Sequence, residues 1–494
     1  MEAARSIHNG HAFSLSDCPV VEIEPFRRDV IEGVAAGGRL SALFGFPSPT
    51  GGGSLRLVAV MAWAERGELT VLSTDVADRF PAITPDCPQA HLFEREIFEQ
   101  WRVEPHGHPW LKPVRFPTPE TAVCGAMDFF EMSGEEVHEV AVGPVHAGVI
   151  EPGHFRFQCH GETVHHLEIS LGYQHRGVER MMRDGPDRRM IHCAETLAGD
   201  STAGHAVAYC RAIESLGGGR VPARGQFLRG IALELERVAN HVGDLGALAG
   251  DVGFLPTMSY CGRIRGDVLN LTALLCGNRF SRGLIRPGGV AWDADPSMVE
   301  QIRHRLKAIA SDAHGALELL WNSTSAMARF DGVGLVSPEL CERLGLVGVA
   351  ARACGDPRDV RRDFPYGVYR FTHIPVSTWH TGDVFARANV RWLEVQRSLA
   401  FLDEQLDSLP AGPVQAEVGS PGAGLGVVAM VEGWRGDICH VALMGDDGRL
   451  AAYQVVDPSF HNWFGLAMAM RGQPISDFPL CNKSFNLSYC GHDL

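Results

Sequence analysis

No two cysteines of this chain form a CxxC pair, although the chain has 13 cysteines among its 494 residues. The two closest in sequence, Cys481 and Cys490, stand nine positions apart (490 − 481 = 9). Local zinc and iron–sulfur sites usually take their thiolates from closely spaced pairs, so this spacing excludes the common forms of both. Scattered single cysteines are typical of reduced, mostly buried thiols in a cytoplasmic protein.

The sequence also lacks long apolar runs, nucleotide-binding motifs and an excess of basic residues. No stretch approaches the ~18 consecutive apolar residues of a membrane helix, so we expect no direct membrane span. There is no phosphate-binding loop, and the glycine-rich GLGVV at 424–428 lacks the strand–turn–helix frame of a dinucleotide site. Lys and Arg number 44 against 59 Asp and Glu, a net charge of −15, which argues against binding to nucleic acid.

The patterns along the chain predict an α+β protein. Two apolar runs separated by ERGE, in LRLVAVMAWAERGELTVLST, predict a hairpin, and QAHLFEREIFEQW predicts a helix. The Pro- and Gly-rich segment 105–120 then interrupts the pattern. We expect an N-terminal α/β domain over residues 1–120, a linker over 121–140 and a mainly α-helical domain with peripheral β-hairpins over 141–494.

Three apolar stripes predict long helices in the second domain. Their positions recur at steps of three and four, which places each stripe on one helix face. An Asp-Pro-Ser start signal at 295–297 precedes the second stripe. The stripes are Leu228, Ile231, Leu235, Val238, Val242 and Leu245; Ile302, Leu306, Ile309, Ala313, Leu317 and Leu320; and Trp392, Val395, Leu399, Leu402 and Leu406. Helices of this kind are expected to pack as a bundle.

Two polar segments have alternative interpretations. HGETVHHLE (160–168) is rich in metal-binding residue types, but neighbouring residues of a strand point to opposite faces, which favours an exposed strand over a metal site. YQHRGVERMM (173–182) is either a charged cluster in a cleft or a surface ion pair. Composition does not decide between the two.

Several longer blocks resemble one known family. GPVHAGVIEPGHFRF, GYQHRGVERMM, QFLRGIALELERVANHVGDLGALAGDVGF, CGNRFSRGLIRPGGV and EGWRGDICH are similar, in order and spacing, to the large subunit of membrane-bound energy-converting nickel–iron hydrogenases such as formate hydrogenlyase. The same blocks resemble the homologous quinone-pocket subunit of respiratory complex I. FEREIFEQW with HGHPWLKPV resembles the small soluble subunit of complex I, which this hydrogenase family carries as an N-terminal fusion.

The resemblance places the metal ligands of the hydrogenases at positions that carry no cysteine here. In the hydrogenases two CxxC pairs hold nickel and iron. The first pair corresponds to Ala198 and Ser201 in AETLAGDSTAGH, and the second, aligned on the shared Ser484 and Tyr489, to Ser488 and Gly491. Cys490 lies between the second two, out of register. The resemblance therefore implies the fold and partners of a hydrogenase, but no nickel–iron centre and no metal bound by this chain.

The same pocket binds a quinone headgroup in complex I, and we expect a quinone or another small electron acceptor here. A histidine can deliver a proton and an arginine can stabilise an anion. The resemblance implies His154, His205 and Arg435 as catalytic candidates, and His146, Arg176, Glu179, Ala198, Ser201, Ser488 and Gly491 as the cofactor-binding set. In the GPxHxxxH pattern of complex I the second histidine would fall at Ile150, so His154 can take that role only in a remodelled loop.

Three hypotheses on function follow. The first is a redox-module subunit of a membrane-associated oxidoreductase complex whose pocket binds the acceptor. The second is a working hydrogenase, against which the missing cysteines count. The third is a non-catalytic coupling or scaffold subunit of the same complex. The histidine and arginine that remain in the pocket favour the first over the third.

The resemblance implies the same partners under all three hypotheses. They are a small iron–sulfur subunit, a ferredoxin-like subunit and antiporter-like membrane subunits. The iron–sulfur clusters lie in these partners, because this chain has no cysteine set for a cluster. We expect the chain to be cytoplasmic and to lie on the inner face of the cell membrane through its partners.

Overall fold

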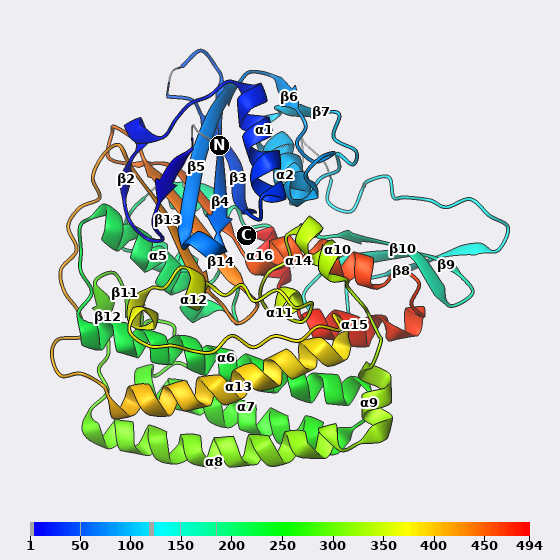
Figure 1. Cartoon of the computed structure of the whole chain (residues 1–494), viewed down its shortest axis with the longest axis vertical. Coiled ribbons are helices and arrows are strands. Elements are labelled where there is room, and N and C mark those ends of the chain that lie inside the picture. Colours follow the sequence, from blue (N-terminus) through cyan, green and yellow to red (C-terminus); the bar gives the residue numbers. More distant parts are fainter. Residues whose placement is uncertain (1–3, 50, 118–122, 149, 184) are drawn as a thin grey trace.

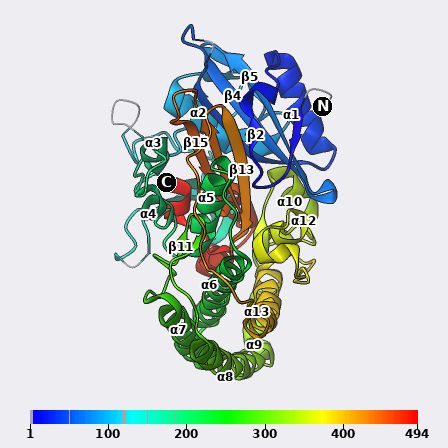
Figure 2. The same cartoon turned by 90° about the vertical axis from the view of Figure 1, so that its left-hand side faces the viewer.

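The structure, a computed structural model, describes residues 4–49, 51–117, 123–148, 150–183 and 185–494. One sheet lies at the top of Figures 1 and 2, long helices lie at the bottom, and a second sheet lies between them. This arrangement confirms the predicted α+β class. The predicted domain boundary at residue 120 falls within 118–122, outside the described residues.

The N-terminal sheet is antiparallel, with the strand order β1-β5-β4-β3. The predicted hairpin is present, since β4 pairs with β5 across a turn in which Gly67 adopts a φ of +64°, a conformation that favours glycine. Two helices pack against the sheet. The elements are β1 (Arg5–Ile7), α1 (Ile23–Ala35), β3 (Arg39–Pro47), β4 (Leu55–Trp63), β5 (Glu68–Val76) and α2 (His91–Trp101).

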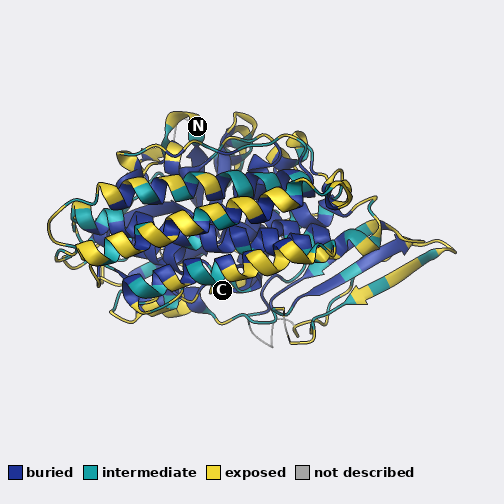
Figure 3. Cartoon of the chain, turned by 90° about the horizontal axis from the view of Figure 1, so that it is seen from below, coloured by how far each residue is buried: buried dark blue, intermediate teal, exposed yellow. Residues whose placement is uncertain are grey.

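Four long helices form the bundle, and the three predicted stripes are confirmed. They are α6 (Ala223–Asp251), α7 (Leu255–Cys276), α8 (Pro296–Trp321) and α13 (Val384–Asp407). All six predicted apolar positions of α6 are fully buried, and burial stabilises by about 1.5–3 kcal/mol for each large side chain. The outer faces of the bundle carry the exposed residues (Figure 3). Asp295 caps α8 by accepting the N–H of Met298, as the start signal predicted.

A second sheet connects the two ends of the chain. It has the order β15-β14-β13-β2, so the N-terminal strand β2 (Phe13–Ser14) pairs with β13 (Leu425–Glu432). The strands β14 (Asp437–Met444) and β15 (Leu450–Val456) complete it, and helix α5 (Thr202–Leu216) covers one face. One continuous apolar core includes residues of the N-terminal sheet, this sheet and the bundle.

A three-stranded arm extends from the body of the molecule (Figures 1 and 3). It consists of β8 (Val137–Val142), β9 (His154–His160) and β10 (Thr163–Ser170), in the order β10-β9-β8. Its base packs on a second apolar cluster that includes Phe155, Trp463 and Tyr489. The loop between β8 and β9 is thereby anchored beside the last helix of the chain.

The remaining elements are short, except for α14. They are β6 (Arg79–Pro81), β7 (Glu104–His106), α3 (Val178–Arg183), α4 (Met190–Ala194), β11 (Ile285–Arg286), β12 (Gly289–Val290), α9 (Thr324–Phe330), α10 (Pro338–Leu344), α11 (Gly348–Arg352), α12 (Val360–Asp363), α14 (Pro458–Ala469), α15 (Phe478–Phe485) and α16 (Tyr489–Asp493). None of the helices in the described ranges has the length and apolarity needed to cross a bilayer.

Candidate functional site

The four positions that correspond to hydrogenase ligands lie at two helix starts. Ala198 and Ser201 precede α5, whereas Ser488 is the N-cap of α16 and Gly491 lies within that helix. All four are buried. The Ser488 hydroxyl accepts the N–H of Gly491 at 2.9 Å, which is the ordinary task of a capping serine. One of the four positions, Ser488, therefore serves here to cap a helix, whereas Ser201 stands at the N-cap of α5 without a side-chain cap bond.

Gly491 has no space for a side chain. A Cβ at this position would lie 2.6 Å from Cγ of Asp457 and 2.8 Å from both of its carboxylate oxygens. Asp457 is fixed in turn, because its Oδ1 caps α14 through the N–H of Ser459 at 2.8 Å. A carboxylate thus lies where the side chain of a fourth ligand would begin.

Arg435 closes the other side of the site. It lies in the turn between β13 and β14 and donates to both oxygens of Asp200 at 2.6 and 2.8 Å. It also donates to the Asn486 carbonyl and, at 3.4 Å, to the Ser201 hydroxyl. Burial acts to lower the pKa of Arg435, but the neighbouring Asp200 carboxylate outweighs this effect, and the net pKa is raised. Arg435 therefore links the first loop to the segment before α16 as a permanent cation.

His205 begins a buried chain of hydrogen bonds. Its Nε2 lies 3.0 Å from Oδ2 of Asp457, and its Nδ1 lies 3.1 Å from Nε2 of His440. Nδ1 of His440 lies 2.7 Å from the Tyr453 hydroxyl. All four side chains are buried.

The Asp457 carboxylate sets the direction of this chain. Burial acts to raise the pKa of Asp457, but the hydrogen bond from His205 outweighs it and the pKa is lowered, so Asp457 accepts. His205 then donates from Nε2, and its Nδ1 accepts from His440. Burial holds the pKa of His440 well below its usual range, so His440 is neutral and accepts from Tyr453. One set of tautomers satisfies every member of the chain.

The two histidines of the arm lie at the edge of this site. Nε2 of His146 contacts the carbonyl of Gly153 at 2.9 Å, and Nδ1 of His154 contacts the carbonyl of Gly143 at 3.3 Å. Burial lowers the pKa of His154. A Cβ at Gly153 would lie 2.6 Å from the Tyr489 ring, so their loop packs directly on α16. Within the described residues no hydrogen bond joins either histidine to His205 or Arg435.

Arg176 belongs to the site, whereas Glu179 lies behind it. Arg176 donates to the carbonyls of Thr196 at 2.7 Å and Leu197 at 3.0 Å, and its Nη2 lies 3.5 Å from the carbonyl oxygen of Cys490. It therefore ties the first loop to α16 from an exposed position, through backbone carbonyls. Glu179 instead accepts the N–H of Val455 at 2.9 Å and lies 3.4 Å from Arg115.

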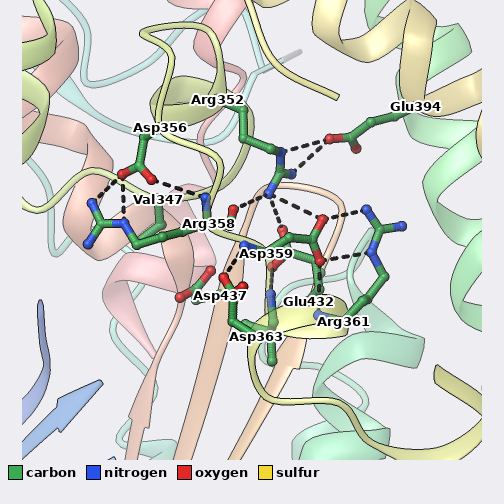
Figure 4. A network of polar contacts seen from close by, with 12 residues as sticks. Val347, Arg352, Asp356, Arg358, Asp359, Arg361, Asp363, Glu394, Glu432 and Asp437 are labelled. Carbon is green, nitrogen blue, oxygen red and sulfur yellow. Dashed lines mark hydrogen bonds and ion pairs between the residues drawn. The ribbon is translucent and has the colours of Figure 1, made fainter. Parts of the chain in front are cut away.

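A buried ion network supports the turn that carries Arg435 (Figure 4). Arg352 pairs with Glu394 and Glu432, each at 2.8 Å. Arg237 donates to the carbonyls of Glu432 and Gly433 at 2.8 and 3.0 Å, three and two positions before Arg435 in the chain. Burial acts to raise the pKa of Glu394, but Arg352 and His241 outweigh it and hold it well below its usual range. Paired charges thus fix the backbone at Arg435.

Residues that sequence reasoning missed hold the site together. Asp200, Asp457, His440 and Tyr453 make its central contacts. Asp457 is followed by Pro and Ser, a helix-start signal like that at 295–297, which marks α14 but not the site. The segment HGETVHHLE (160–168) is explained by an exposed strand, since on β10 His165 is exposed and His166 is only half-buried.

These residues do not fit a nickel–iron centre. Such a centre needs thiolates, which are soft sulfur donors, and the four ligand positions offer Ala198, Ser201, Ser488 and Gly491. Cys490 is the one thiol here, with Sγ 3.3 Å from the Ser488 hydroxyl, and burial raises its pKa to about 11. In the described part of the chain no three His, Cys, Asp or Glu side chains are grouped as metal ligands.

Comparisons with known proteins agree with the resemblance. Residues 251–422 match the family described as the 49 Kd subunit of respiratory-chain NADH dehydrogenase. The chain is 28% identical to formate hydrogenlyase subunit 5 of Escherichia coli, over 99% of this chain and 91% of that protein. It is 31% identical to the carbon monoxide-induced hydrogenase of Rhodospirillum rubrum, over 71% of this chain and 97% of that protein.

A third relative is an NADH-quinone oxidoreductase subunit of Carboxydothermus hydrogenoformans. It is 31% identical over 69% of this chain and 93% of its own length. Hydrogenase subunits and NADH-quinone oxidoreductase subunits are therefore both similar to this chain. The chain belongs to the family of hydrogenase large subunits and their relatives in complex I.

Proposed function

We propose that this chain is a redox-module subunit of a membrane-associated oxidoreductase complex, and that it holds no nickel–iron centre. The observation that carries the proposal is the set of residues at the four positions that correspond to hydrogenase metal ligands. None of these positions offers a thiolate, and Asp457 fills the space beside Gly491. Relatives named as formate hydrogenlyase and NADH-quinone oxidoreductase subunits support this kind of complex.

The pocket is proposed to receive a quinone or another small electron acceptor. Arg435 is 4% exposed, but its partner Asp200 keeps 35% of its side chain exposed, so solvent reaches the ion pair on the Asp200 side. Arg435 can stabilise negative charge on an oxygen beside it, and the histidines His154 and His205 can hold a proton. When bound, a quinone would supply an acceptor of electrons and protons.

A second candidate is a coupling or scaffold subunit with a closed pocket. It is favoured by the complete internal bonding of the polar groups, because Arg435, His205 and Ser488 all have partners within the chain. An acceptor would have to displace one of these bonds. The two candidates therefore differ in whether the ion pair at Arg435 opens during turnover.

The partners proposed are a small iron–sulfur subunit, a ferredoxin-like subunit and antiporter-like membrane subunits, which place the chain on the inner face of the cell membrane. Exposed apolar side chains beside the pocket support an iron–sulfur partner there: Val145 is 77% exposed, Ile150 55% and Met181 42%. Glu151 and Gln174 join the two segments that carry these residues, at 2.9 Å. Electrons would enter through this face.

Paired measurements separate the two candidates. Arg435→Met should leave assembly nearly intact on a native gel but reduce quinone reduction by membranes about tenfold to a hundredfold. Arg435→Met leaves the Asp200 carboxylate without its ion-pair partner. The double variant Arg435→Met with Asp200→Asn therefore tests the loss of the guanidinium without leaving an unpaired carboxylate. Arg305→Met, on the exposed face of α8, is the matched control. Activity that falls only in proportion to assembled complex would establish the scaffold role.

Metal analysis tests the other half of the proposal. The purified complex should contain no stoichiometric nickel and should take up no hydrogen with a viologen dye. About one nickel per chain would overturn the proposal, because the ligand positions offer none of the soft donors that such a site takes.

A further inference from the structure

A cavity that is separate from the site at Arg435 opens between segments that are far apart in the sequence. It has a volume of about 1050 Å³ and is formed by residues 8–12, the C-terminal half of α5, the first turns of α6 and residues 364–370. Arg211 in its wall lies ten residues beyond Ser201 along α5, which corresponds to about 15 Å of helix. The cavity is therefore not part of the former metal site.

The ionisable side chains that line this cavity are mostly basic. They are His8, His11, Arg211, Arg220, Arg229 and Arg370, against the single carboxylate Glu214. That carboxylate is already used, since it accepts from Arg229 at 3.1 Å and from the N–H of Gly288 at 2.7 Å. Arg211, Arg220 and Arg370 make no ion pair within the described residues. Such a concentration of unpaired cations is unusual in a chain with a net charge of −15.

Arg211 is the most constrained of these cations. It donates to the carbonyls of Met430 at 2.8 Å and Asn9 at 3.2 Å, and its guanidinium lies 4.8 Å from the centre of the Tyr366 ring. Gly10 passes so close that a Cβ there would lie 2.3 Å from Nη2 of Arg211. Burial lowers its pKa to about 10. A partly buried guanidinium without a carboxylate partner gains stability when an anion binds beside it.

The basic groups also lie within electrostatic range of one another. The pKa of His11 is lowered first by burial and then by the positive charges of His8, Arg370 and Arg211. The first turn of α6 adds to this field, because Val221 and Gln226 line the cavity and no side chain caps that helix. Cations from three separate segments thus converge on one space.

We propose that this cavity binds a small polyanion that carries phosphate or carboxylate groups. Guanidinium groups form paired hydrogen bonds with both kinds of group. The volume is close to the upper end of the range of small-molecule sites. Glycines at positions 67, 218, 219 and 367 are among the residues that line the cavity and let a ligand approach the backbone. The proposal does not depend on the function proposed for the pocket at Arg435.

Calorimetric titration of the purified complex with inorganic pyrophosphate and with citrate tests the proposal. At least one probe should bind, and more weakly as sodium chloride screens the charges. Arg220→Gln and Arg370→Gln replace exposed side chains and should each weaken binding about tenfold, or about 1.4 kcal/mol. Arg305→Gln, an exposed arginine of α8 outside the cavity, should bind as the unaltered protein does.

Three results would overturn the proposal. One is the absence of binding by either probe up to about 10 mM, well above a weak Kd of about 1 mM. Another is equal binding by the two cavity variants and the control. The third is that neither small anion binds but a glutamate-rich peptide does, and that Arg370→Gln weakens the binding of this peptide. The cavity would then be a docking site for an acidic protein segment.

Discussion

Gly491→Ala tests whether Asp457 has replaced a metal ligand. The added Cβ would lie 2.6 Å from Cγ of Asp457, and an ordinary contact needs at least 3.4 Å, so the two groups must separate by about 0.8 Å. Asp457 resists this shift, because one of its oxygens holds His205 at 3.0 Å and the other holds the N–H of Ser459 at 2.8 Å. Overpacking of this kind costs about 1–3 kcal/mol. We expect Gly491→Ala to destabilise the protein by about 2 kcal/mol.

The matched control is Gly199→Ala, in the loop that carries Ala198 and Ser201. Nothing lies within 4 Å of a Cβ built at Gly199, and this glycine does not adopt a positive φ. Its replacement should change the stability by less than about 0.5 kcal/mol. Urea unfolding of each variant, followed by circular dichroism, gives the two values.

A double-mutant cycle with Asp457→Ala makes the test specific. Asp457→Ala destabilises the protein on its own, because it leaves His205 without an acceptor. In that background the clash at Gly491 is gone, so adding Gly491→Ala should cost little, and the coupling free energy should be about 1 kcal/mol or more. Equal effects of the two glycine substitutions, or no coupling, would refute the reasoning.

The remaining predictions concern the groups around the site. Glu394→Gln removes the negative charge that pairs with Arg352 and Arg237, and it should lower the free energy of unfolding in urea by about 3–5 kcal/mol. Asp312→Asn, at an exposed ion pair, should lower it by at most about 1 kcal/mol. Equal losses would contradict the role of the network. Burial raises the pKa of Glu96 to about 7, above its unfolded value. The protonated Glu96 therefore contributes fully to stability below about pH 4.5, and this contribution is lost as the pH rises to about 7. Glu96→Gln should flatten the dependence of the unfolding free energy on pH in that window, and an unchanged slope would refute this. Tyr453→Phe removes the hydrogen-bond partner of His440 and should cost about 1–3 kcal/mol. Tyr209→Phe, whose hydroxyl makes no hydrogen bond within the described residues, should cost less, and the reverse order would contradict a stabilising hydrogen bond between Tyr453 and His440.

Local patterns predicted the helices well because helix periodicity lies within one segment. The stripe in α6 needed only the spacing from Leu228 to Leu245, and its six positions are all buried. The hairpin of β4 and β5 was predictable for the same reason. In contrast, the pairing of β2 with β13 joins residues more than 400 positions apart, and no local signal in Phe13–Ser14 selects that partner.

The candidate site was predictable only as a set of positions. The family resemblance located Ala198, Ser201, Ser488 and Gly491, and the structure brings their two segments together through Arg435 and Arg176. The resemblance could not identify the side chains that contact these positions, since an aspartate before a helix has the same sequence signal whether it only caps that helix or also accepts a hydrogen bond from a histidine. Asp457 does both. That double role depends on the packing of α5, which carries His205, against β13 and β14 of the sheet whose last strand ends just before Asp457.

Charge balance explains why the carboxylates are where they are, and it yields a last prediction. Without thiolates, Arg435 would be a buried cation and His205 a buried donor, and leaving either group unpaired is costly. Asp200 pairs with Arg435, and Asp457 accepts from His205, so two carboxylates supply the negative groups that the site needs. Restoring cysteine at positions 198, 201, 488 and 491 would add four sulfur groups without removing either carboxylate, and the Cβ at 491 would still collide with Asp457. We therefore expect the fourfold cysteine variant to bind no nickel in elemental analysis unless Asp457 is also replaced by a smaller residue, because the carboxylate and the thiolate compete for one space. Stoichiometric nickel in the fourfold variant with Asp457 intact would show that the carboxylate does not close the site.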